Sequence, residues 1–587
     1  MPEGIVQEQV TAAIADAVAE AKRKGLLHSS SPPVCTVEFP KREEWGDLSS
    51  SVAMTIAKME KRPPREVADL LAKQLEESCP FVDQVEVAPP GFLNLTLRRD
   101  FWFSVLHEIE GKGETYGHSE LVRGKRVLLE YVSANPTGPL HIGHGRGAAL
   151  GDAMARVLRA VGYSVEREFY INDAGRQMNL LAASVYARYQ EYHGSAVSFP
   201  EDGYQGAYIR TVAEHIAHTV GTQLLDLPLS EALEQCKVMA CEELLEAIKQ
   251  DLLSFGVGFD SWYPETRLFS SGTIRETLET LKQRDLVFEK DGALWFRSSR
   301  FQDEKDRVVC KQDGDYTYLA SDIAYHHDKL KRDFDQLINI WGADHHGYVP
   351  RMQGVMQAFG YSKDRLQVVL VQMVSLLRGG RKVEMSKRAG EFVTLREVVD
   401  EVGADAAKFF FLMRRPDSHL EFDLELAKKQ SAENPVYYVQ YAHARLASLF
   451  RVAQNRGILV PPAGDANLTV LVQPEEFRLI KHLSSFPGLV EGCARALEPH
   501  RLTFYLQELA GHLHAFYYKH RVLPSREEGT TGPELDLGGM NADRVGVRAQ
   551  ESPSHELTTA RLVLLRQVQT VIRNGLTLLG VTAPEQM

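Results

Sequence analysis

Residues 130–147, with the sequence EYVSANPTGPLHIGHGRG, constrain the fold of this chain more than any other stretch. The apolar residues 127–129 just before it predict a buried strand. Pro136, Gly138 and Pro139 then impose a sharp turn, and small apolar residues at helical spacing predict a helix beyond it. A strand, a Gly/Pro turn and a helix N-terminus together favour anion binding, because free backbone N–H groups and the helix dipole point toward the turn.

The turn carries two imidazoles, His141 and His144, on either side of Gly143. Its spacing matches neither GxGxxG nor GxxxxGK[ST], and HxGH alone is also compatible with a turn that a histidine caps. A second segment, VEMSKRAG at residues 383–390, lies well downstream. In this order the two segments resemble the HIGH signature and the KMSKS loop of class I aminoacyl-tRNA synthetases.

That resemblance implies ATP as a substrate, accompanied by Mg²⁺. It implies that His141 and His144 contact the ATP phosphates during adenylate formation, and that Lys387 closes over the pyrophosphate. Glu384 stands where the loop of this family usually begins with lysine. The second lysine of the loop is present here as Lys387. The further ATP contacts that the resemblance implies are Pro136, Gly138, Leu140, Gly143, Gly342, Asp344, Met385 and Ser386.

The segment DYTYLASDIAYHHDK places Tyr318 and Asp322 four residues apart, on one face of a helical turn. A carboxylate and an aromatic ring suit a guanidinium, which is a planar cation with a fork of N–H donors. The segment resembles the specificity helix of arginyl-tRNA synthetases, and FDSWYPETRLF supplies Glu265 as a third guanidinium partner by the same resemblance. Glu130, Ser133 and Asn135 match the residues around the α-amino end of the amino acid.

Composition bounds the class of protein. The chain has 587 residues, of which 44% are hydrophobic and 25% charged, as is ordinary for a globular protein with several domains. Its six cysteines form no CxxC or Cys/His pattern, so neither disulfides nor a structural metal is expected. No signal-like start or bilayer-spanning run is evident, which predicts a cytoplasmic protein without membrane contact.

The pattern of strands and helices in residues 1–115 predicts a separate α+β domain. The segments 34–39, 83–88 and 92–97 alternate as half-buried strands, with helices expected over 47–60 and 64–77. The block EFPKREEWGDLSSSVAMTIAKMEKRPPREVA resembles the N-terminal domain of arginyl-tRNA synthetases, which touches the tRNA elbow. A packing module without RNA contacts is the alternative.

Strands and helices alternate through residues 116–433, which predicts a Rossmann-like, doubly wound parallel sheet as the catalytic domain. Residues 164–171 and 366–377 are expected to be strands of this sheet, and residues 337–347 a strand followed by a turn. The charged stretch of about 175–300 is expected to be a helical insertion between the two halves of the sheet. The fold class is therefore α/β, flanked by an α+β domain and an all-α domain.

Residues 434–587 read as helices and resemble the helical anticodon-binding domain of class I enzymes. Aromatic rings beside cations suit single-stranded RNA, although helical aromatics more often belong to a core. The net charge of −12 argues weakly against an RNA partner, but only the local field steers RNA. Residues 525–555 are polar and Gly-rich, which predicts a flexible surface insertion. The candidate tRNA contacts are Tyr437, Tyr441, Arg445, Tyr518, Arg521 and Met587.

Taken together, the resemblance extends over nearly the whole chain. It implies an enzyme, expected to be a monomer, that activates L-arginine with ATP and transfers it to tRNA(Arg). Two alternatives remain open at this point. A nucleotidyltransferase could use the same fold on a small acid, and a paralogue could bind RNA without catalysis.

Overall fold

Five parallel strands form the central sheet of the computed structural model, which describes residues 5–28, 36–383, 393–524 and 552–587. The spatial order is β12-β11-β5-β6-β7. The chain first adds β6 and β7 on one side of β5, and then adds β11 and β12 on the other side. The crevice between the carboxyl ends of β5 and β11 is thus a topological switch point, where such sheets bind ligands. The strands are β5 (Arg126–Glu130), β6 (Ser164–Ile171), β7 (Ser261–Pro264), β11 (Gln336–Gly342) and β12 (Leu366–Val371).

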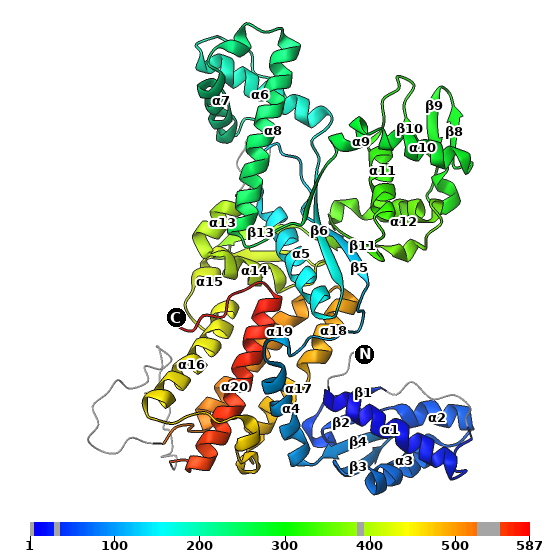
Figure 1. The fold of residues 1–587 in the computed structure, drawn as a ribbon, viewed down its shortest axis with the longest axis vertical. Helices are drawn as coiled ribbons and strands as arrows, with labels where there is room; N and C mark the ends of the chain where they lie inside the picture. The colour runs from blue at the N-terminus through cyan, green and yellow to red at the C-terminus, as the bar shows by residue number, and fades with distance from the viewer. Residues whose placement is uncertain (1–4, 29–35, 384–392, 525–551) are drawn as a thin grey trace.

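The doubly wound expectation is confirmed, but two of its details are wrong. The stretch 366–377 is not one strand, because β12 ends at Val371 and β13 (Val374–Arg378) pairs with β15 (Leu420–Asp423) in a separate sheet. The helical insertion is shorter than 175–300, since β7 returns to the central sheet. The insertion contains α6 (Arg176–Tyr192), α7 (Ala207–Val220) and α8 (Leu229–Ser254), which project from one end of the molecule (Figure 1).

The remaining elements of this region surround the sheet. Helix α5 (Ile142–Ala160) crosses from β5 to β6 and is buried along most of its length. The segment between β7 and β11 contains α9 (Thr266–Ser270), α10 (Thr273–Gln283), a small sheet of β8 (Val287–Lys290), β9 (Ala293–Phe296) and β10 (Arg307–Cys310), and then α11 (Tyr318–Lys331). The later elements are α12 (Val349–Ala358), β14 (Arg381–Lys382), α13 (Leu395–Val402), α14 (Ala404–Leu412) and α15 (Leu424–Lys428).

The N-terminal region is an antiparallel sheet of order β1-β2-β4-β3 covered by helices. Residues 48–50 form β2 rather than the start of the expected helix 47–60, because they pair with β4. The elements are α1 (Ile5–Arg23), β1 (Val37–Glu38), β2 (Leu48–Ser50), α2 (Val52–Glu60), α3 (Pro64–Ser78), β3 (Val82–Ala88), β4 (Phe92–Leu97) and α4 (Arg99–Lys112).

The C-terminal region is helical, as expected. Its helices are α16 (Pro435–Asn455), α17 (Pro474–Ser484), α18 (Phe486–Ala496), α19 (His500–Lys519) and α20 (His555–Leu578). Most of the expected flexible insertion 525–555 lies outside the described residues. Among the helices that the structure describes, none has the length and apolar character that crossing a bilayer requires.

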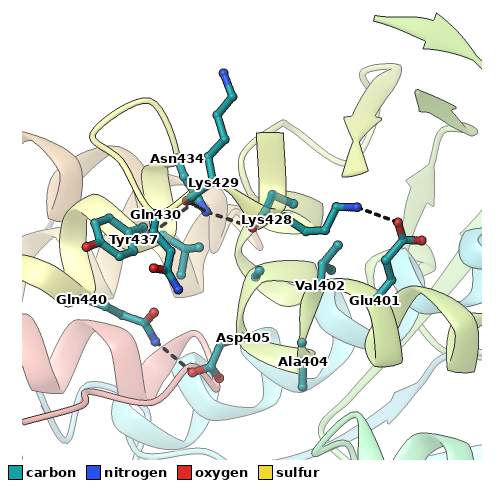
Figure 2. Close-up of a pocket in the computed structure, with 14 residues that line it drawn as sticks. Glu401, Val402, Ala404, Asp405, Lys428, Lys429, Gln430, Asn434, Tyr437 and Gln440 are labelled. Carbon is teal, nitrogen blue, oxygen red and sulfur yellow. Dashed lines mark hydrogen bonds and ion pairs between the residues drawn. The ribbon is translucent and has the colours of Figure 1, made fainter. Parts of the chain in front are cut away.

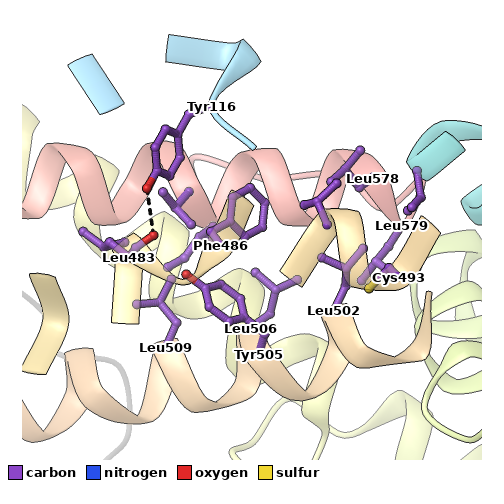
Figure 3. Packing of buried hydrophobic residues seen from close by; sticks show 14 of the residues in the cluster. Tyr116, Leu483, Phe486, Cys493, Leu502, Tyr505, Leu506, Leu509, Leu578 and Leu579 are labelled. Carbon is purple, nitrogen blue, oxygen red and sulfur yellow. Dashed lines mark hydrogen bonds between the residues drawn. The ribbon is translucent and has the colours of Figure 1, made fainter. Parts of the chain in front are cut away.

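One hydrophobic core continues through all three regions. Helix α4 packs on α17 and α20, and the Tyr116 hydroxyl donates to the Leu483 carbonyl at 3.0 Å (Figure 3). Phe486 and Tyr505 pack beside this bond, with ring centroids 5.4 Å apart. The helical region is therefore held against the rest of the chain by shared apolar packing.

Candidate functional site

The two histidines of the HIGH-like turn cap helix α5. His141 is the N-cap residue, and its Nδ1 accepts from the Gly143 N–H at 3.1 Å. The His144 Nδ1 in turn accepts from the His141 N–H at 3.3 Å, and the two rings stack with centroids 3.8 Å apart. A side chain at position 143 would meet the His141 ring, since a Cβ there would lie 2.9 Å from its Cε1. This contact is sufficient to explain why position 143 is a glycine.

This capping fixes the tautomer of both rings. A backbone N–H can only donate, so each Nδ1 must hold a lone pair and each neutral ring carries its proton on Nε2. The histidine cap that the spacing alone allowed is therefore real, and it does not exclude a role in binding. Each ring then carries an Nε2–H group at a helix N-terminus, where backbone N–H groups and the helix dipole favour phosphate oxygens.

The segment that follows the KMSKS-like loop joins this turn. The Leu395 N–H donates to the Leu140 carbonyl at 2.7 Å, and Thr394 pairs with His141 in an isolated bridge. Thr394 and Glu397 form a capping box at the start of α13. Glu384, Met385, Ser386 and Lys387 themselves lie outside the described residues.

Carboxylates converge beyond the carboxyl end of β5. Glu130 ends that strand, Glu265 follows β7, and Asp322 lies in the second turn of α11. Glu265 is only 4% exposed, and its Oε2 has no hydrogen-bond partner among the residues that the structure describes. A buried carboxylate oxygen without a donor is costly. The pocket therefore fits a cationic group that brings its own N–H donors.

The charges in this pocket are mutually unfavourable. Burial, followed by the negative charge of Asp322, raises the pKa of Glu265 to about 7. Burial also raises the pKa of Asp322 to about 6, against the hydrogen bond that Tyr348 donates to its Oδ2 at 2.5 Å. A guanidinium between these groups would supply the positive charge that both lack.

Glu130 differs from the other two because its charge is already neutralised. The Lys329 ammonium, which is completely buried, donates to Glu130 Oε2 at 2.5 Å and to Asn339 Oδ1 at 3.0 Å. Ser133 donates to the other oxygen of Glu130 at 2.9 Å. Glu130 thus helps to fix the loop after β5, whereas Glu265 and Asp322 form no ion pair with any residue in the part of the chain that the structure describes.

The loop after β5 has an unusual backbone that positions its polar groups. Val132 and Ser133 have φ of 68° and 35°, in the region that L residues rarely adopt. The Ser133 hydroxyl accepts from the Tyr170 N–H at 3.2 Å, and Asn135 donates to the Asn172 carbonyl at 2.9 Å. Ser133 and Asn135 therefore brace the loop against β6. Tyr318, at the first residue of α11, is 66% exposed.

The other candidate ATP contacts lie on the same edge of the sheet. Gly342 ends β11, and the exposed Asp344 follows it in a 3₁₀ turn beside His345, 3.6 Å away. Leu140 is buried under the HIGH-like turn. The turn of Pro136 and Gly138 is covered by the insertion, because the Tyr208 hydroxyl donates to the Thr137 carbonyl at 2.9 Å.

The candidate tRNA contacts lie on α16, α19 and the tail. The rings of Tyr437 and Tyr441 lie 5.9 Å apart, and the Arg445 guanidinium lies 4.2 Å from the ring centroid of Tyr517. Tyr518 and Met587 are exposed, whereas the Arg521 carbonyl accepts a hydrogen bond from the Arg561 guanidinium at 2.6 Å.

The tail lies along α16, as the resemblance implied. Gln440 and His443 bind the carbonyls of Thr582 and Pro584 at 3.0 and 2.9 Å. Tyr437 also lines a cavity of about 460 Å³ between α13, α14 and α16, together with Lys428 and Lys429 (Figure 2). Polar and basic groups are thus gathered where the two larger regions of the chain meet.

Several residues of the site escaped the sequence prediction. Tyr348 and Tyr208 belong to no predicted motif, and Arg146 lies in the 130–147 stretch without a predicted role. The roles of all three depend on contacts between distant segments. Lys329 could have been predicted from the sequence, because it lies seven residues after Asp322 and therefore on the same face of α11.

Three family models match the chain. They are described as the catalytic domain of class I tRNA synthetases (R), at residues 107–431; the DALR anticodon binding domain, at 439–537 and 544–587; and the arginyl tRNA synthetase N terminal domain, at 6–97.

Curated relatives match over almost their whole length. The arginine--tRNA ligase of Syntrophotalea carbinolica is 48% identical and is covered over 96% of each chain. That of Citrifermentans bemidjiense is 47% identical, covering 99% of this chain and 100% of the relative. A structure titled as a putative arginyl tRNA synthetase from Campylobacter jejuni has 34% identity and a TM-score of 0.72, covering 84% of this chain and 100% of the other.

Proposed function

The chain belongs to the arginyl-tRNA synthetase family of class I aminoacyl-tRNA synthetases, and from that membership we propose which of its residues carry the reaction. The enzyme activates L-arginine with ATP and transfers the arginyl group to tRNA(Arg). Membership at this identity over the whole chain excludes the alternative of a nucleotidyltransferase for a small acid. The chemistry below concerns individual side chains.

The pocket beyond β5 is proposed to hold the arginine substrate. Glu265 and Asp322 would accept the guanidinium, with Tyr318 closing over it from the start of α11. The observation that carries this assignment is the buried, unpartnered oxygen of Glu265, 4% exposed as a residue and beside a second ionisable carboxylate. Glu130, Ser133 and Asn135 would meet the α-amino end, from a loop that Lys329 and the β6 backbone hold in place.

The turn at the start of α5 is proposed to bind ATP. The substrate carboxylate attacks the α-phosphorus and pyrophosphate departs, so the site must orient two anions and offset charge on the phosphates. The Nε2–H groups of His141 and His144 would donate to phosphate oxygens. Pro136, Gly138, Leu140, Gly143, Gly342 and Asp344 would line the nucleotide site, and Met385, Ser386 and Lys387 would reach it from their loop. Mg²⁺, entering with ATP, would neutralise phosphate charge.

The tRNA is proposed to contact the helical region and the N-terminal domain. Tyr437, Tyr441, Arg445, Tyr518, Arg521 and Met587 are the candidate contacts for the anticodon arm, supported by their position on α16, α19 and the adjoining tail. We propose domains at 1–115, 116–433 and 434–587, a division that the matched family models support. A cytoplasmic monomer is part of the same proposal.

The arginine pocket can be tested by removing charge from one side at a time. Asp322→Asn should raise the KM for arginine at least about 100-fold, because a desolvated charge-assisted pair is lost. Citrulline is a near-isostere of arginine without the positive charge, and the parent enzyme should not transfer it to tRNA. Asp328→Asn on the same helix is the matched control, because Asp328 is an acid that pairs with Arg332 at 3.4 Å. Equal use of citrulline and arginine by the parent would show that the pocket is misplaced.

A further inference from the structure

Three potential metal ligands meet in the helical region, away from the residues of the reaction. His482 belongs to α17, whereas Glu508 and His512 lie four residues apart on one face of α19. One ligand atom from each residue lies within 4.8 Å of the other two. Because the residues come from two packed helices, only the tertiary fold brings the three together.

The imidazole of His482 is held in one orientation. Its Nε2 lies 3.2 Å from the Tyr505 carbonyl, and the two rings stack with centroids 4.3 Å apart. The Tyr505 hydroxyl donates back to the His482 carbonyl at 3.0 Å. Since a carbonyl only accepts, Nε2 carries the proton and Nδ1 keeps its lone pair. A metal at this site would therefore have to bind Nδ1 of His482, with the Tyr505 carbonyl orienting the ring through the other nitrogen.

The other two ligands differ in their exposure to solvent. The side chain of Glu508 is 64% exposed and that of His512 is 25% exposed, and His512 Nε2 lies 3.7 Å from Glu508 Oε1. Glu508 can therefore adjust its side chain, whereas the Tyr505 carbonyl and ring hold His482 in place.

We propose that His482, Glu508 and His512 form a binding site for a divalent transition metal of the Zn²⁺ class. Two imidazoles and one carboxylate suit such an ion, whereas Mg²⁺ and Ca²⁺ prefer oxygen ligands. Tetrahedral zinc with bonds of about 2.0–2.1 Å would place its ligand atoms about 3.4 Å apart. Movement of the exposed Glu508 side chain would bring the ligand atoms toward that spacing, and solvent would supply water as the fourth ligand.

A metal at this site would link α17 to α19 beside the N-terminal domain. Lys481, the neighbour of His482, forms an ion pair with Asp47, which belongs to that domain. The Leu483 carbonyl on the other side accepts from Tyr116 at 3.0 Å (Figure 3). The ion would thus brace the junction between the helical region and the N-terminal half, independently of ATP and arginine.

Calorimetric titration of the chelator-stripped full chain with Zn²⁺, without ATP or tRNA, tests the site. The parent should bind Zn²⁺ at this site, and both His512→Ala and Glu508→Gln should weaken that binding at least about tenfold. His215→Ala is the matched control, because His215 pairs with Glu243 at 2.8 Å without a second imidazole. That variant should bind as the parent does.

Thermal unfolding gives a second readout, since an ion that binds the folded state raises Tm. Zn²⁺ should raise the Tm of the parent and of His215→Ala, but raise it less for His512→Ala and Glu508→Gln. Both substitutions are on the surface side of α19, so either variant suffices if the other does not fold. Equal affinity and equal Tm increments in the parent and in these two variants would overturn the proposal.

Discussion

At the scale of single residues, the histidines of the HIGH-like turn are positioned by the same bonds that cap α5. The bonds to Gly143 N–H and His141 N–H fix both rings as Nε2–H tautomers. The motif therefore specifies a local structure and a set of donors at once. This explains why the sequence alone could place His141 and His144 correctly at the helix start.

Substitution can separate these two roles. Asparagine is a good N-cap residue, so His141→Asn should keep the helix start but lose the Nε2–H donor. We expect kcat to fall about 10²- to 10⁴-fold with little change in the KM for arginine or in Tm. Steady-state charging assays and thermal unfolding give these values. A variant with near-normal kcat would assign the ring a structural role only.

The raised pKa values predict how arginine binding depends on pH. The guanidinium is charged throughout, whereas Glu265 and Asp322 have pKa values of about 7 and 6 in the free protein. Arginine binds their ionised forms, so affinity should be full above pH 7 and fall as pH decreases through 7 and then 6. Equilibrium titration with arginine between pH 5 and pH 8 measures this. Glu265→Gln should lose the upper transition, and a pH-independent Kd in the parent would contradict the assignment.

Glu265 should also make the free enzyme less stable at high pH. Its folded pKa lies above the usual value near 4.5, so protonation contributes stability that is fully present below pH 4.5 and lost as pH rises through 7. The difference corresponds to at most about 3 kcal/mol. Without ligand, the decrease in Tm from pH 5 to pH 8 should be smaller in Glu265→Gln than in the parent. An identical decrease in both proteins would contradict the raised pKa.

At the scale of elements, the periodic strands and helices of the sheet were predictable, whereas elements set by distant contacts were not. The expected strand 164–171 is β6, residue for residue. Leu48–Ser50 becomes a strand only because β4 lies beside it, and 366–377 is divided between two sheets. Strand β7 could not be recognised in the sequence, because it has only four residues and follows the charged helices of the insertion.

Arg146 shows how a buried side chain joins elements. It is 1% exposed and donates to the carbonyls of Gln372, Arg415 and Ser418 at 2.8–2.9 Å, which ties α5 to the second sheet. Burial lowers its pKa to about 10, so it stays charged at neutral pH.

Arg146→Met would leave those three acceptors without a donor, at about 1–3 kcal/mol each. We expect a clearly lower Tm and a loss of activity, because α5 begins at the turn that we propose to bind ATP. Arg159→Met on the same helix is the matched control, since Arg159 is 41% exposed and its partner Asp260 is also bound by Arg167. Equal Tm changes in the two variants would contradict a special role for Arg146.

At the scale of the whole molecule, the helical region cannot be separated from the catalytic sheet. The Lys408 ammonium, on α14, donates to the carbonyls of Gly256 and Gly580 at 3.0 Å, and Asp405 accepts from the Thr582 N–H at 3.1 Å. A chain that ends near residue 430 would expose this junction and the shared core. Point substitutions on α16 are therefore the sound way to test anticodon binding.

The contact between tail and catalytic region could not be predicted from the sequence, because Asp405 and Thr582 are 177 positions apart. The order of the three regions could be predicted, because each region has its own hydrophobic periodicity and its own motifs. The sequence could place Lys329 on the same face of α11 as Asp322, but it could not show that Lys329 neutralises Glu130, which lies 199 positions away.

The central claim is that the carboxylates of Glu265 and Asp322 select arginine for transfer to tRNA. The most direct test is to measure charging of tRNA with each of the twenty amino acids by the full-length enzyme, with Asp322→Asn measured in parallel. The account predicts charging with arginine in preference to all others and a large loss in the variant. Charging of any other amino acid at higher kcat/KM than arginine would contradict it.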